Sequence, residues 1–120
     1  AMGTKKGVDV SASDIFALSA RAEQAQLVIQ KNHQDLDPII SINRSLRARG
    51  YPIDLMTIDC LVTHRRLTFM LNDATPELVG YRFGALDPDD QGDFSHTAYS
   101  EVTSDQLVTW IVQVFSKRHD

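Results

Sequence analysis

Cysteine is nearly absent from this sequence, which has one thiol, Cys60, in 120 residues. A lone thiol cannot form a disulfide within its own chain, so a disulfide-stapled scaffold is excluded. Such sparse cysteine is typical of proteins in a reducing compartment, and we expect a cytoplasmic location.

Long apolar runs are missing as well, since none approaches the roughly 20 residues that span a bilayer. Lys5 and Lys6 lead into Gly7 rather than into the apolar block of a signal peptide. We therefore expect no membrane partner.

The motifs of common enzyme classes are also missing. The chain has no glycine-rich phosphate loop and no Gly-x-Ser-x-Gly elbow. Cys60 and His64 share one face of a predicted strand, but four strand residues span about 13 Å, too far for a catalytic pair. No two of the histidines have metal-ligand spacing; they are His33, His64, His96 and His119. We therefore predict no metal, no cofactor and a non-enzymatic protein, and keep as an alternative a small hydrolase or metal enzyme built from distant residues.

What is present is an ordinary globular composition. Hydrophobic residues make up 42% of the chain and charged residues 23%, and 120 residues fit one domain. Residues 1–10 are small and polar, so we interpret them as a loose tail, in which Ala1 before Met2 is a cloning remnant. Residues 11–120 are predicted to form a single domain.

Two helices are predicted in the first half of the chain. The first covers residues 13–32, because its apolar residues recur at alternating spacings of three and four; they are Ile15, Leu18, Ala22, Ala25 and Ile29. We expect this stripe to pack against the domain's own core, and the alternative is a dimer seam at the two alanines. Asp37 and Pro38 are typical of a second helix start, and Gly50 of its left-handed end. The alternative is one long helix kinked at Pro38.

After Pro52 the apolar residues alternate with a period of two, which predicts strands at 58–62, 67–71 and 79–83. The short polar breaks between them indicate an antiparallel meander. A fourth strand is expected at 96–102. Thr103 and Gln106 form the pattern of a capping box, and an amphipathic helix should follow. The fold class is therefore α+β in the order α-α-β-β-β-(β)-α, a small antiparallel meander packed against N-terminal and C-terminal helices.

The charges fall into two blocks, although the net charge of −4 disfavours general nucleic-acid binding. One block is basic and contains Arg44, Arg47, Arg49, Arg65 and Arg66. If the predicted helix end and hairpin tip meet, these guanidinium groups would suit a phosphate or carboxylate; the sequence leaves open whether they meet. The other block is an acidic surface loop with Asp87, Asp89, Asp90 and Asp93. Its start resembles a calcium loop, but Ala98 occupies the position of the bidentate glutamate, so we predict no calcium site.

Our leading hypothesis is a binding or adaptor module that acts through protein contacts, either with another protein or as a homodimer. In size, acidity and the order helix, meander, helix, the chain looks like the small acidic chaperones that hold secreted effector proteins. That resemblance implies chaperone-like binding of protein. The alternative is a nucleic-acid or phosphate-ligand binder that uses the arginine group.

Overall fold

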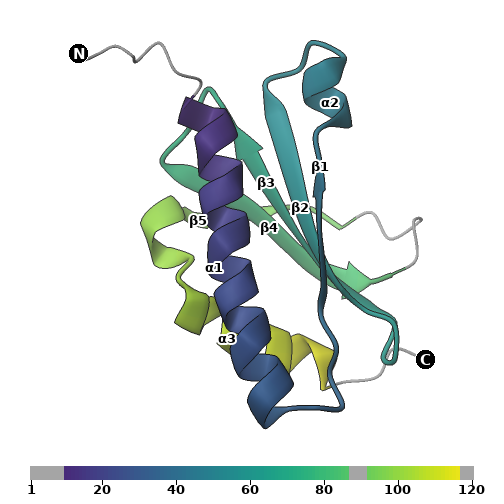
Figure 1. The fold of residues 1–120 in the computed structure, drawn as a ribbon. Helices are drawn as coiled ribbons and strands as arrows, with labels where there is room; N and C mark the ends of the chain where they lie inside the picture. Colours follow the sequence, from purple (N-terminus) through teal and green to yellow (C-terminus); the bar gives the residue numbers. More distant parts are fainter. Residues whose placement is uncertain (1–9, 87–91, 117–120) are drawn as a thin grey trace.

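A long helix, an antiparallel sheet and a shorter helix make up the fold in the computed structural model, which describes residues 10–86 and 92–116 (Figure 1). The helices are α1 (Val10–Asn32), the single-turn α2 (Ser45–Ala48) and α3 (Ser104–Phe115), and the 3-10 helix η1 (Tyr99–Glu101) precedes α3. The strands are β1 (Ile39–Asn43), β2 (Ile53–Cys60), β3 (Arg65–Asn72), β4 (Leu78–Ala85) and β5 (Ser95–Ala98). The predicted α+β meander between terminal helices is confirmed.

The five strands lie in the order β1-β2-β3-β4-β5, and each pairs antiparallel with the next. The β2–β3 hairpin has Cys60 opposite Arg65. The sequence predicts a strand through residue 62, but Leu61 and Val62 are exposed turn residues instead. The strand predicted at 96–102 is β5, and it is shorter than expected because η1 begins at Tyr99. The two longer helices, α1 and α3, pack on the same face of this sheet (Figure 1).

The prediction of a helix starting at Asp37-Pro38 is wrong. Residues 39–43 form the edge strand β1, and the helix is reduced to the one turn of α2. Ile39, Ile40 and Ile42 are β-branched, and such side chains fit a pleated strand better than a helix. Pro38 is compatible with this outcome because it precedes the strand, where its missing N–H breaks no ladder hydrogen bond. Gly50 does end α2 with a positive φ of 95°, as predicted.

The core lies between the helices and the covered face of the sheet. All five residues of the α1 stripe are fully buried within the chain, including Ala22 and Ala25. The stripe therefore packs internally, and the alanines are not free to form a dimer seam. Along β2 every second residue is buried, and the last of these is Cys60. The alternation means that one face of the sheet meets the helices and the other does not.

The C-terminal helix begins as the sequence predicts. The Thr103 hydroxyl accepts a hydrogen bond from the backbone N–H of Gln106 at 3.1 Å. Trp110 then stacks on Tyr81 of β4, with ring centroids 5.0 Å apart, and also contacts Phe69 and Phe83. No helix in the described part of the chain is both long and apolar enough to cross a bilayer.

Candidate functional site

Arg44 and Arg47 meet at a buried aspartate beside α2. The side chain of Asp54 is fully buried, and its Oδ1 accepts hydrogen bonds from Nε of Arg44 and Nε of Arg47, both at 3.0 Å. Arg47 also donates to both carboxylate oxygens of Asp73, at 2.7 and 3.1 Å. The hydrogen bonds to Asp73 and then to Asp54 raise the pKa of Arg47. These arginines therefore hold the β1–β2 connection to the sheet, and their charges are neutralised.

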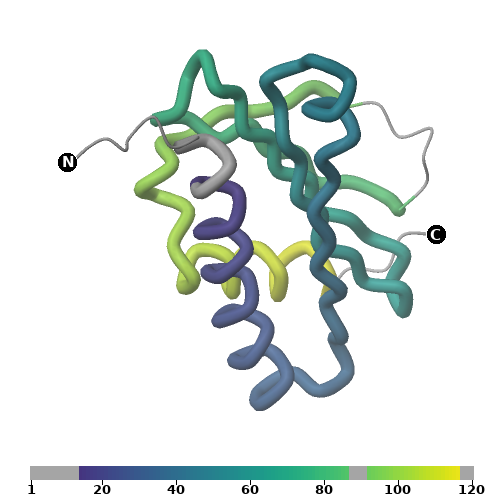
Figure 2. The backbone as a smooth tube through the Cα atoms, turned by 45° about the horizontal axis from the view of Figure 1, so that its top comes forward, coloured from purple at the N-terminus to yellow at the C-terminus, as the bar shows by residue number. Residues whose placement is uncertain are grey.

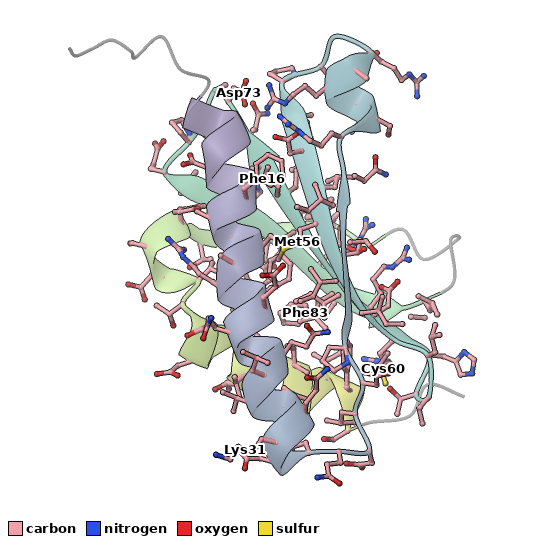
Figure 3. All side chains as sticks on the ribbon, in the orientation of Figure 1. Phe16, Lys31, Met56, Cys60, Asp73 and Phe83 are labelled. Carbon is pink, nitrogen blue, oxygen red and sulfur yellow. The ribbon has the colours of Figure 1, made fainter. Side chains whose placement is uncertain are left out.

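Arg66 lies elsewhere, on the face of the sheet that the helices leave open. It pairs with Asp59, its register partner on β2, through two hydrogen bonds of 2.7 and 2.9 Å. The hydrogen bond to Asp59 raises the pKa of Arg66. Asp54 and Asp59 are five strand residues apart, roughly 16 Å, and point to opposite faces. Asp73 is a partner of Arg47, and Cys60 follows Asp59 in β2. Figure 3 shows Asp73 and Cys60 toward opposite ends of the sheet.

The five arginines therefore do not form one site. Arg44 and Arg47 belong to one buried network, and Arg66 to a separate pair. Arg49 and Arg65 form no ion pair with any residue in ranges 10–86 and 92–116. These two arginines belong to different elements, because Arg49 is an exposed residue after α2 and Arg65 begins β3 at the hairpin. The arrangement does not bring the guanidinium groups of all five arginines to one ligand, and the phosphate or nucleic-acid alternative stays a hypothesis.

Asp87, Asp89 and Asp90 lie outside the described residues, and Asp93 is exposed. Cys60 is fully buried and His64 is an exposed turn residue with a positive φ of 57°. Within the described ranges no three His, Cys, Asp or Glu side chains are grouped closely enough to hold a metal ion.

The structure does contain a groove that sequence reasoning missed, between α1 and the edge strand β1. In Figures 1 and 2, α1 and β1 run alongside each other and are joined at one end by residues 33–38. The groove has a volume of about 430 Å³ and is open to solvent on one side. Its lining residues are Ser19, Glu23, Gln26, Asp37, Pro38, Ile39, Ile40 and Ile42. The volume falls within the range of about 300–1,000 Å³ that is usual for ligand sites.

Each wall of the groove has a simple origin in the sequence. Ser19, Glu23 and Gln26 are spaced by four and three residues, so they lie in a row along one flank of α1. On the other wall, Ile40 and Ile42 are two residues apart and therefore point to the same face of β1. Both isoleucines are only half-buried, because α1 does not cover this edge of the sheet completely.

One hydrogen bond closes an end of the groove. The side-chain amide of Gln26 donates to the carbonyl oxygen of Pro38 at 2.7 Å. This bond ties α1 to the start of β1, so the separation of the two walls is set by the fold. At the other end the Arg44 guanidinium lies 5.4 Å from the ring centroid of Phe16, which is exposed.

The backbone of β1 is available on one side. β1 is the first strand in the sheet order and has a strand neighbour, β2, on one side only. In an antiparallel edge strand, alternate N–H and C=O groups point away from the partner strand and can accept another one. The groove thus combines a half-buried apolar surface with unpaired backbone hydrogen-bonding groups at its rim.

Two carboxylates give the groove its charge. Glu23 and Asp37 are exposed on its lining, to which the described part of the chain contributes no Lys, Arg or His. Neither carboxylate forms an ion pair with another residue among those the structure describes. The groove is therefore acidic as well as apolar.

The run Ile39-Ile40-Ser41-Ile42-Asn43 carried a signal for this site. Three β-branched residues with a polar residue between two of them favour a strand, but the apparent helix start at Asp37 and Pro38 led to the prediction of a helix.

Comparison of the chain with protein families, with curated proteins and with solved structures gave no match, so it places the protein in no family.

Proposed function

We propose that the protein is a non-enzymatic binding module that takes up an extended segment of a partner protein as an additional strand beside β1. The observation that supports this proposal is the groove itself, an open strand edge beside a channel whose strand wall is apolar and whose helix wall is polar. An added strand would gain backbone hydrogen bonds from β1. Its alternate side chains would enter the channel and provide the specificity.

The size of the groove suits such an occupant. Pro38, Ile39, Ile40 and Ile42 line one wall, and the five residues from Pro38 to Ile42 extend over roughly 16 Å when the chain is extended. Ser19 and Gln26 on the opposite wall are seven helix residues apart, which is about 10 Å. A segment of about five residues would therefore lie along the groove, with two or three of its side chains facing α1.

A second copy of the chain is the rival occupant, because two β1 edges could pair around a two-fold axis. Such pairing would bring Glu23 and Asp37 of both copies into the same groove. Like charges placed opposite each other destabilise strand pairing. The charge of the groove therefore favours a different partner over self-association.

The test is to select binders from a library of random seven-residue peptides and to compare two charged variants of β1. Ile42→Glu places a carboxylate in the groove, whereas Ser41→Glu places one on the opposite, exposed face of the same strand. Burying an unpaired charge against the peptide should weaken binding by tenfold or more for Ile42→Glu and leave Ser41→Glu unchanged.

Thermal unfolding of both variants controls for loss of the fold. The proposal fails if the library yields no binder. It also fails if the selected peptides bind both variants as tightly as the original chain, because they would then occupy another surface.

A further inference from the structure

Building on the proposed function, we infer that the segment taken up carries a lysine or arginine on its groove-facing side, where it pairs with Glu23. The inference concerns the chemistry of the ligand rather than the existence of the site. Glu23 lies in the middle of the α1 wall, one helical turn from both Ser19 and Gln26. It therefore faces the middle of any strand that lies along the groove.

Among the residues that the structure describes, none supplies a cation to the carboxylate of Glu23. Its side chain forms no ion pair within ranges 10–86 and 92–116, and no basic side chain from these ranges lines the groove. Arg44, which follows β1, is already engaged by Asp54 at 3.0 Å, and Arg21 on α1 donates to the backbone carbonyls of Tyr99 and Val102. Asp37 adds a second negative charge to the same lining. A cationic side chain entering the groove would meet two carboxylates and no competing cation.

The apolar residues on the facing wall define the rest of the pattern. Ile40 and Ile42 are half-buried and offer apolar surface on the strand side. Side chains of an added strand that face the groove are two residues apart, so they form a row of three over a five-residue segment. We therefore expect a basic residue in the middle of this row with an apolar residue on each side, in the order apolar-x-basic-x-apolar.

A symmetric probe removes the question of strand direction. The peptide acetyl-Gly-Val-Thr-Lys-Thr-Val-Gly-amide has the same side-chain order in both directions, and its two valines and its lysine share one face. Two matched peptides replace the lysine by glutamine or by glutamate. Affinities are measured by titration at low and high salt, and the position of binding is mapped by backbone amide chemical shifts.

The lysine peptide should bind tightest and the glutamate peptide weakest, with about two- to fivefold between neighbours, the usual effect of one partly exposed ion pair. High salt should reduce the differences because the pair is open to solvent. Glu23→Lys should reverse the order of the peptides. Glu101→Lys makes the same change in net charge at an exposed position on η1 and should leave the order unchanged.

The outcomes separate the two proposals. If all three peptides shift the β1 amides and bind equally, the proposed function stands and the pairing with Glu23 is wrong. A reversal of the order by Glu101→Lys as well would assign the preference to net charge and would also contradict the pairing. If none of the three binds at millimolar concentration, or if the chain forms a dimer through β1, both proposals are overturned.

Discussion

At the scale of single residues, Asp54 is the side chain on which the β1–β2 connection most depends. It is fully buried, and two arginines from the segment around α2 donate to the same oxygen. A buried carboxylate is tolerated only when it is paired and hydrogen-bonded, and removing one partner leaves the other charges uncompensated. The sequence shows Asp54 at an inward position of the β2 alternation, but it does not show which arginines would reach it.

Asp54→Ala should therefore destabilise the protein by about 3 kcal/mol, the usual cost of breaking a buried ion pair. Asp59→Ala is the matched control, because it removes a carboxylate from the same strand whose partner, Arg66, has a side chain that is 37% exposed. That change should cost about 1 kcal/mol or less. Chemical denaturation of the two variants measures both values, and equal costs would contradict the role given to Asp54.

At the scale of helices and strands, the sequence predicts those elements whose pattern and end signals agree. The stripe of α1 and the cap of α3 were both recognisable, because the burial pattern and the local hydrogen-bonding residues indicate the same structure. β1 was missed because its signals conflict: Asp37 and Pro38 favour a helix start, whereas the isoleucines after them favour a strand. Pairing with β2 decides between them, and that pairing is not visible locally.

The packing of α3 depends strongly on one side chain. Trp110 contacts three aromatic rings, with centroid separations of 5.0 to 6.0 Å, and it is the single tryptophan of the chain. Because it is half-buried, Trp110→Ala should cost about 2–3 kcal/mol, somewhat less than for a fully buried aromatic residue. Thr109→Ala, at the exposed neighbouring position, should change stability by about 0.5 kcal/mol or less.

Thermal unfolding followed by circular dichroism measures both changes. A Trp110→Ala variant as stable as the original chain would mean that α3 is held by its aliphatic residues alone, among them Leu107 and Ile111.

At the scale of the whole molecule, the candidate site results from how a helix and a sheet edge are placed. The groove exists because α1 packs beside β1 without covering Ile40 and Ile42 completely. Its lining comes from α1, from the segment before β1 and from β1 itself, and no local motif records that combination. The arginine group shows the opposite relation between sequence and structure, because arginines that are close in the sequence are apart in the fold. Arg44 and Arg47 bind Asp54, whereas Arg66 binds Asp59. These two aspartates lie toward different ends of β2 and point to different faces of the sheet.

The most direct test of the central claim is amide hydrogen exchange of β1, with and without the lysine peptide described above. In the free protein, the β1 amides that point away from β2 have no strand partner and should exchange rapidly. If the peptide adds as a strand, those same amides should become protected while exchange in β5, at the opposite edge, stays unchanged. Peptide binding that leaves the β1 amides as unprotected as before would contradict the account.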